Sequence, residues 1–382
     1  METAMRQTWA FLFRGYHITR RYIGWVVVFN FYAVVTSATV ALIGVAENKP
    51  ELTLTLVVGA LLWNYLSWLY QEIAMSIAYE RWEGTLEYTF MAPVSRAVHL
   101  LGVSLFSLVN SIVTSIIVLI GLMLFTNLTL RGANMFGVVV VLGVSTLAFV
   151  GLGLFAAVFP VMSAERGAEA THIFQGSLLL VSGVYYPVDV LPGWMQPLSA
   201  ISPATYTLSA CRKLFGVGNS ATTPELLAGA PLSAVSYELL VLAVMGAILL
   251  PLGLMVFIRV EAWAKSLDID IMATARATNA ALPHLERAGE QGGSGAILNI
   301  ASISGYGASA RSPAYGAAKA AVISYTASQA LLLAPKRIRV NAIAPGSIEF
   351  PGGLWEQRKA AQPQLYNAVL KSIPWGRLGR PE

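Results

Sequence analysis

Two groups of residues in this chain have types and spacings that could do chemistry. In the first, Tyr315 and Lys319 lie four residues apart, so they share one face of a helix predicted to begin near Ser312. A cation at that distance favours the phenolate, and such a pair can serve in general acid–base catalysis. Ser302 lies thirteen residues before Tyr315. The Tyr-x-x-x-Lys pattern is common in proteins, so this spacing alone does not establish an active site.

The second group lies in the segment 78–102. Glu80, Glu83 and Glu87 recur at positions i, i+3 and i+7, which predicts three carboxylates on one helical face, with Arg81 beside them. Pro93 is predicted to end this element. The spacing leaves two interpretations open. The segment is either a solvated loop helix that only fixes topology, or a rigid acidic lever that docks on another protein at the membrane surface.

The composition indicates the elements that must carry these residues. Only 12% of the 382 residues are charged, against about 25% in ordinary soluble domains, and 56% are apolar. The mean hydropathy is +0.63. Residues 1–265 hold 13 basic and 13 acidic residues, whereas residues 266–382 hold 12 and 7, so no nucleic-acid partner is expected. The single cysteine, Cys211, excludes a disulfide scaffold and a multi-cysteine metal site, and no metal is expected.

Long uncharged runs predict membrane spans, because about 20 apolar residues cross the hydrocarbon core of a bilayer. Six such runs predict six spanning helices: residues 22–46, 52–71, 97–130, 132–164, 170–188 and 239–258. A further uncharged run, 190–211, contains three prolines and favours a broken or re-entrant element. None of the six runs carries an acidic or basic residue at mid-depth, which argues against a proton- or ion-coupled transporter.

The segments outside the runs predict the orientation of the chain. Residues 1–22 are predicted to form an interfacial helix with aromatic residues on its lipid side. Four arginines are spread over its 21 first residues, which is unlike a cleavable signal peptide. Basic residues gather at alternate ends of the runs in a way that places both termini in the cytoplasm.

Two stretches of the membrane part resemble a known family. ERWEGTLEYTFMAPVSR (80–96) resembles the E-R-E-x-G-T-L-E…P-x-x-R loop of type-2 ABC exporter permeases, with Trp82 in place of the frequent second glutamate. SGVYYPVDVLPGWMQPLSAISPATYTLSACR (182–212) is similar to the segment after the fifth span of that family. The resemblance covers roughly residues 5–262.

The resemblance to exporter permeases implies partners and contact residues. A separate ABC ATPase subunit would hold ATP-Mg, since the chain has no G-x-x-x-x-G-K-[ST] phosphate loop. A second permease copy or paralogue would complete the transport path in the lipid bilayer of a bacterial-type inner membrane. The resemblance assigns five residues to ATPase coupling: Glu80, Arg81, Glu83, Gly84 and Glu87.

The last third of the chain resembles a different family. NIASISGYGASARSPAYGAAKAA (299–321), followed by RVNAIAPGSI (339–348), resembles short-chain dehydrogenases/reductases. By this resemblance Ser302, Tyr315 and Lys319 match the catalytic serine, tyrosine and lysine, and Asp270 stands where the family has an asparagine. The glycine-rich turn that holds the dinucleotide in that family is not found. We therefore expect vestigial catalytic residues, no cofactor in this chain, no NAD(P) and no enzyme activity.

The predicted fold class is an all-α six-span transmembrane helical bundle followed by a partial α/β (Rossmann-like) fragment. The expected domains are the interfacial helix 1–22, an ABC transporter permease domain at 23–262, and a dehydrogenase-like segment at 266–382 that lacks the nucleotide-binding half. The expected function is that of an exporter permease subunit for drugs, lipids or polysaccharides, coupled to its ATPase through the loop 78–96. Two alternatives stay open: a membrane-anchored NAD(P)-dependent short-chain oxidoreductase, and a scaffold that recruits one.

Overall fold

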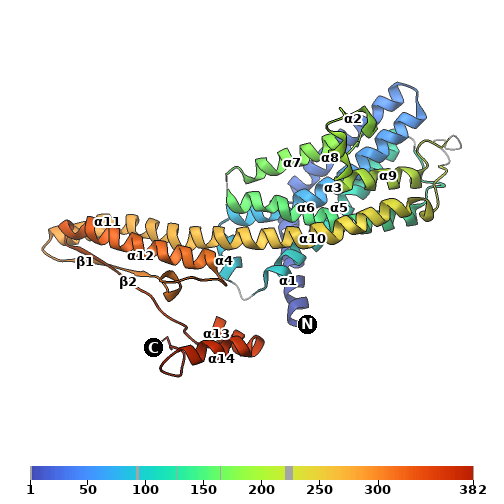
Figure 1. Cartoon of the computed structure of the whole chain (residues 1–382). Helices are drawn as coiled ribbons and strands as arrows, with labels where there is room; N and C mark the ends of the chain where they lie inside the picture. Colours follow the sequence, from blue (N-terminus) through green and yellow to red (C-terminus); the bar gives the residue numbers. More distant parts are fainter. Residues whose placement is uncertain (1, 92–93, 127, 164, 220–226, 382) are drawn as a thin grey trace. The chain divides into compact units, whose positions relative to one another are not determined.

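The chain folds into two compact units, Met1–Glu261 and Ala262–Glu382, in a computed structural model (Figure 1). The structure describes residues 2–91, 94–126, 128–163, 165–219 and 227–381. The first unit is helical, and the second combines helices with one small sheet. The predicted fold class, a membrane-type helical bundle followed by a partial α/β fragment, is therefore confirmed.

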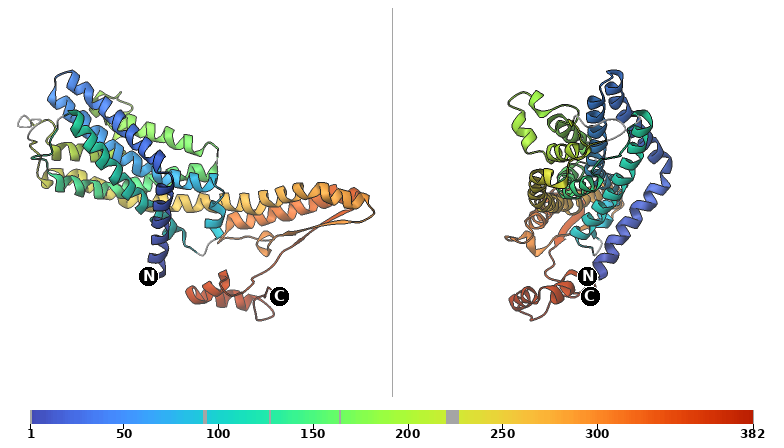
Figure 2. Two further views of the ribbon diagram at one scale, coloured as in Figure 1. Left: turned by 180° about the vertical axis from the view of Figure 1, so that it is seen from behind. Right: turned by 90° about the vertical axis from the view of Figure 1, so that its right-hand side faces the viewer.

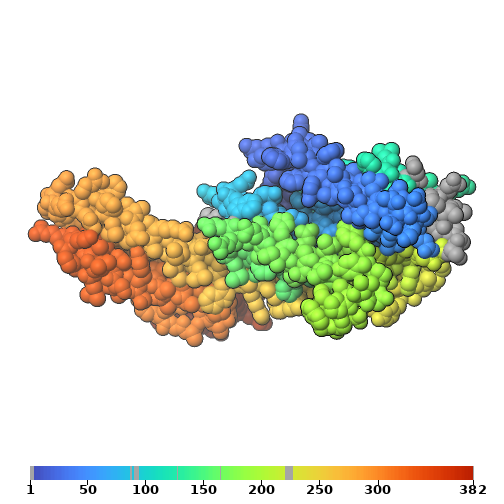
Figure 3. Space-filling model, turned by 90° about the horizontal axis from the view of Figure 1, so that it is seen from above, coloured from blue at the N-terminus to red at the C-terminus, as the bar shows by residue number. Residues whose placement is uncertain are grey.

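The first unit is built around one long helix. Its helices are α1 (Glu2–Arg21), α2 (Ile23–Ala46), α3 (Pro50–Trp82), α4 (Leu86–Met91), α5 (Arg96–Thr126), α6 (Met135–Met162), α7 (Gly167–Val181), α8 (Gln196–Ala200), α9 (Pro203–Phe215) and α10 (Ser236–Lys265). Helix α3 packs against α2, α5, α6, α7 and α9. In Figure 2 the dark-blue α1 runs at an angle to these helices. The side chains of α1 and α2, drawn in blue, cover one side of the unit in Figure 3.

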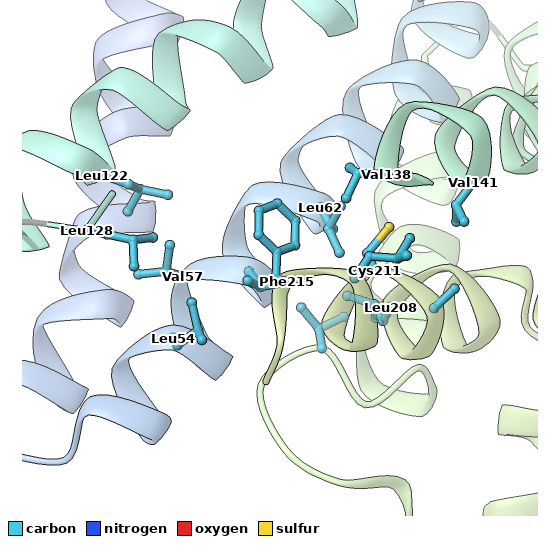
Figure 4. Packing of buried hydrophobic residues seen from close by; sticks show 14 of the residues in the cluster. Leu54, Val57, Leu62, Leu122, Leu128, Val138, Val141, Leu208, Cys211 and Phe215 are labelled. Atoms are coloured by element: carbon cyan, nitrogen blue, oxygen red, sulfur yellow. The ribbon is translucent and has the colours of Figure 1, made fainter. Parts of the chain in front are cut away.

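The core of this unit lies where α3 meets the helices around it. Apolar side chains from α3, α5, α6 and α9 interdigitate there (Figure 4). Cys211 is fully buried in this cluster, beside Leu208 and Phe215 on the same helix. A thiol in such surroundings behaves as a small apolar side chain.

Among the described residues, six helices are long and apolar enough to cross a membrane. Five of them coincide with predicted runs, in α2, α3, α5, α6 and the helical stretch that contains α10. The sixth, Pro313–Lys336, belongs to the second unit. The predicted run 170–188 instead gives α7, whose 15 residues extend only about 22 Å at 1.5 Å per residue. Helix α7 ends because Gly183 adopts a positive φ of 66° directly after Ser182.

Helix α3 is longer than its uncharged run predicted. It continues past Glu72 and Glu80 to Trp82, a length of 33 residues or about 50 Å. Glu72 therefore lies inside the helix, ten residues before its end, and hydrogen-bonds the side chain of Asn110 on α5.

The second unit contains a two-stranded parallel sheet. Strands β1 (Gly295–Ile300) and β2 (Ile338–Ile343) pair in register from Gly295 opposite Ile338 to Ile300 opposite Ile343. Helices α11 (Ala273–Glu290) and α12 (Pro313–Leu333) pack on the strands, while α13 (Leu354–Ala361) and α14 (Pro363–Ser372) pack on each other. The unit begins with the last turn of α10, from Ala262 on, and π-helical turns follow at Ser266–Met272.

Candidate functional site

The loop predicted to form one acidic helix is broken into two helices. Helix α3 ends at Trp82, Glu83 follows as its cap, and α4 begins at Leu86. The break occurs at Gly84, whose φ of 67° lies in the left-handed region that only glycine adopts without strain. Since a turn separates the predicted carboxylates, the prediction that Glu80, Glu83 and Glu87 share one helical face is wrong.

Glu80 is an internal anchor of the bundle. Its side chain is only 5% exposed, and its Oε1 accepts a hydrogen bond from Nη2 of Arg14 on α1. Nε2 of His99 on α5 lies 3.2 Å from the same oxygen. The His99 ring packs on Phe11, with 4.8 Å between ring centroids. One carboxylate thus ties α1, α3 and α5 together, and the sequence pattern contained no indication of these partners.

The remaining predicted coupling residues lie at or beside the turn. Glu83 and Gly84 are exposed, and Arg81 is partly buried. The side chain of Glu87, on α4, lies outside the described residues. Trp82 is half exposed, and its ring meets that of Tyr79 edge-on at 5.5 Å between centroids. The accessible part of this loop is therefore an exposed turn held on a buried frame.

Arg96 and Glu261 form a second buried ion pair at this end of the unit. Nε of Arg96 lies 2.7 Å from Oε1 of Glu261, and the two side chains are 17% and 5% exposed. Nη1 of Arg96 also donates to the carbonyl oxygen of Thr89 on α4 at 2.9 Å. The sequence contains Arg96 in its loop motif, but Glu261 lies 165 residues later, and no spacing connects the two.

The second unit gathers the residues matched to a dehydrogenase site. Ser302 follows the carboxyl end of β1 and is buried, and its Oγ accepts a hydrogen bond from the backbone N–H of Ser304 at 3.2 Å. Tyr315 and Lys319 lie on α12, with Nζ of Lys319 5.6 Å from the Tyr315 ring centroid. The spacing prediction of a shared helical face holds for this pair.

Lys319 is also held by two groups that the spacing did not predict. Its Nζ donates to the carbonyl oxygen of Ile300 at 2.9 Å and lies 2.9 Å from Oδ1 of Asp270. Asp270 comes from the π-helical turns at the start of the unit. The residue that replaces the family's asparagine therefore forms an ion pair with the lysine.

Comparisons with known proteins bear on both units. Residues 4–215 match the family model "ABC-2 type transporter", and residues 242–382 match "Enoyl-(Acyl carrier protein) reductase". Cis-4-hydroxycyclohexanecarboxylate dehydrogenase of Sinomonas cyclohexanicum is 40% identical over 124 residues, which are 32% of this chain and 46% of that protein. Dehydrogenase/reductase SDR family member 4 of Homo sapiens is 33% identical over 124 residues, 32% of this chain and 41% of that protein.

A third relative shows the same pattern. Isoepoxydon dehydrogenase of Aspergillus clavatus is 37% identical over 126 residues, 32% of this chain and 46% of that protein. The chain spans less than half the length of these three relatives. Their identity to the C-terminal segment points toward an oxidoreductase, so the prediction that the chain is not an enzyme is wrong.

The match of the membrane part assigns the chain to a family. The transporter match covers more than half of the chain, and the helices of this part are long and apolar enough to make a multi-pass membrane protein. The chain belongs to the ABC-2 type transporter family, as a transporter membrane subunit whose C-terminal segment is similar to short-chain dehydrogenases/reductases.

Proposed function

We propose that the chain is the permease subunit of an ATP-driven exporter, coupled to a separate ABC ATPase through the turn between α3 and α4. The observation that carries this proposal is the contrast within the loop. Trp82, Glu83 and Gly84 are exposed, while Glu80, only two residues before Trp82, is locked to α1 and α5. A partner that pushes on this turn would move three helices together rather than bend one loop.

The proposed mechanism is mechanical transmission. ATP-Mg binds the partner, its two domains close, and their surfaces displace the turn. The helices tied by Glu80 then rock between two arrangements that differ by a few kcal/mol. The substrate classes that fit the resemblance are drugs, lipids and polysaccharides, and the proposed location is a bacterial-type inner membrane with both termini in the cytoplasm.

A second permease copy or paralogue is part of this proposal. The most apolar stretches of α2 and α5 are only 22% and 28% buried within the chain, and the stretch containing α10 is 17% buried. Lipid or another permease must cover these surfaces, because a membrane protein exposes such apolar sides only to lipid or to another helix. A path between two copies would use part of this surface.

The test is reconstitution of this chain with a co-expressed ABC ATPase subunit. We expect Glu83→Ala with Glu87→Ala to lower ATPase association or permease-dependent ATP turnover about tenfold, a change of about 1.4 kcal/mol. The matched control is Glu47→Ala with Glu51→Ala, two exposed carboxylates near the opposite end of α3, which we expect to leave both quantities unchanged. If the unmodified chain binds no ATPase, the proposal is rejected.

A second candidate function concerns the C-terminal unit, where Tyr315 and Lys319 share a face of α12. Tyr315 would act as the proton donor or acceptor at a substrate oxygen, and Lys319 would orient it. The dinucleotide that this family implies does not fit the residues present. The Lys319 ammonium already contacts the Asp270 carboxylate and the Ile300 carbonyl oxygen, and the glycine-rich turn is not found in the sequence. The proposed role of this unit is therefore limited to proton transfer at a substrate oxygen.

The test of this second candidate offers the full chain the ketone that corresponds to cis-4-hydroxycyclohexanecarboxylate, the compound in the name of one relative, in D₂O and without a dinucleotide. Proton transfer at the carbonyl oxygen accelerates enol formation and so the exchange of the hydrogens beside the carbonyl for deuterium, and we expect Tyr315→Phe to abolish this turnover. The control is Tyr306→Phe, because Tyr306 is 73% exposed and has no assigned role. Absence of turnover in the unmodified chain would reject the candidate.

A further inference from the structure

Arg96 contacts two elements that the sequence places far apart. Its guanidinium donates to the carbonyl oxygen of Thr89 on α4 and pairs with the carboxylate of Glu261 near the end of α10. Thr89 is among the last four residues of α4, whose carbonyls have no partner within the helix, so Arg96 caps this short helix. Both contacts are made by one planar group with donors on several edges.

The pair with Glu261 is shielded from water. Its side chains are 17% and 5% exposed, and its N–O distance is 2.7 Å. An ion pair at the surface is weak and would break when one of its helices moved. Separation of a buried pair would leave an uncompensated charge, so Arg96 and Glu261 stay together when α4 moves. Movement of α4 is therefore passed to Arg96 and from there to α10.

We propose that Arg96 is the positioning residue that transmits displacement of α4 to α10. This inference rests on the proposed function, because the displacement comes from the ATPase that docks on the turn before α4. The bridge needs a guanidinium, since it must reach Thr89 and Glu261 at once. A lysine ammonium can balance the charge of Glu261 but cannot hold both partners in this geometry.

The test separates bridging from charge balance through the variant Arg96→Lys. This variant keeps a cation for Glu261, so we expect it to fold and to bind the ATPase as the unmodified chain does. The readout is labelling of a reporter cysteine at Arg259→Cys on α10, an exposed position, by a water-soluble maleimide with and without ATP and vanadate. The native Cys211 does not interfere, because it is fully buried.

We expect the labelling rate to depend on nucleotide in the unmodified background, and this dependence to be lost in Arg96→Lys. The matched control is Lys213→Arg, which alters the ion pair of Lys213 with Glu238 near the other end of α10, at 2.6 Å, and should keep the nucleotide dependence.

Each other outcome counts against the inference. Nucleotide-dependent labelling that survives in Arg96→Lys, with the ATPase bound, would overturn it and leave the proposed function standing. Loss of ATPase binding in that variant would give Arg96 a purely structural role and would also overturn the inference. If the unmodified chain binds no ATPase, the proposed function fails and the inference fails with it.

Discussion

At the scale of single residues, carboxylates remain inside this apolar bundle because each one has a specific partner. Arg14 and His99 contact Glu80, Asn110 contacts Glu72, and Arg96 contacts Glu261. The cations beside Glu80 and Glu261 balance a charge that would be costly alone, whereas the Asn110 amide gives Glu72 a hydrogen bond. Glutamate is itself a good helix former, so α3 runs through both Glu72 and Glu80 without ending.

Removing the charge of Glu80 should loosen three helices at once. In Glu80→Gln the Arg14 guanidinium loses its carboxylate, and because Arg14 is 34% exposed we expect a loss of about 2 kcal/mol, below the roughly 3–5 kcal/mol of a fully buried pair. The measurement is the thermal unfolding midpoint in detergent. Glu83→Gln, at an exposed residue, is the control and should leave the midpoint unchanged. Equal midpoints for both variants would show that Glu80 anchors nothing.

Asp270 gives a second prediction at this scale. In Asp270→Ala, Lys319 keeps the Ile300 carbonyl but loses its counter-ion, and we expect faster amide hydrogen exchange in α12, equivalent to a loss of about 1–2 kcal/mol. The control is Glu286→Ala, which breaks an exposed ion pair with Lys336. This variant should change the opening free energy derived from amide hydrogen exchange by less than about 1 kcal/mol. Unchanged protection of α12 in Asp270→Ala would contradict the assignment.

At the scale of elements, the sequence predicted helices well where one property decides them. Uncharged runs predicted α2, α5 and α6, and the charged residues that flank each run predicted the ends of these helices to within a few residues. The predictions failed where a distant contact or a backbone conformation decides. The uncharged run that predicted α3 stops before Glu72, because the sequence does not show that Asn110, 38 residues later, contacts this glutamate. The predicted acidic helix runs through Gly84, but the left-handed φ of Gly84 separates α3 from α4 there.

The same holds for the candidate sites. The Tyr315–Lys319 pair follows from helical spacing, which is local, and the structure reproduces it. The partners of Lys319 and Arg96, which are Asp270 and Glu261, come from other elements and have no sequence signal of their own. Local periodicity therefore found the residues, and only the fold shows what holds them.

Close packing of α6 on α10 gives a prediction at the scale of elements. A Cβ at Gly151 would lie 2.5 Å from the backbone carbonyl of Leu249, which cannot move cheaply, whereas a Cβ at Gly143 on the same helix would meet nothing within 4 Å. We expect Gly151→Ala to destabilise the protein by about 1–3 kcal/mol through overpacking. Gly143→Ala should stabilise it by up to about 1 kcal/mol, since alanine is the better helix former.

The measurement is the thermal unfolding midpoint of the two alanine variants. We expect the midpoint to fall in Gly151→Ala and to rise in Gly143→Ala. Shifts of the same sign would mean that helix propensity rather than the α6–α10 contact controls stability here. Small residues that allow two backbones to approach are a common device in membrane helices.

At the scale of the whole molecule, the match to the transporter family and the similarity to short-chain dehydrogenases/reductases lie on either side of the start of α10. The transporter match ends at residue 215 and the reductase match begins at residue 242, inside α10, which is also part of the most apolar candidate span. The helix that closes the membrane unit therefore leads directly into the dehydrogenase-like segment. Along the chain, the π-helical turns Ser266–Met272 follow α10 directly and α11 follows them.

The exposed apolar sides of α2 and α5 lead to a prediction about assembly. Lipid alone can cover them, but a transport path needs a second wall, so we expect two copies of this chain, or one copy and a paralogue, in each complex with the ATPase. Native mass spectrometry of the nanodisc complex measures the stoichiometry directly.

A bulky charged substitution such as Leu124→Arg, at a 78% exposed position on α5, tests whether that side of the helix faces a partner. If α5 lines the interface, Leu124→Arg should shift the complex from two permeases to one while the single chain stays folded. A stoichiometry of two in both proteins would place the interface on α2 or α10 instead, and a single permease in the unmodified complex would contradict the paired path altogether.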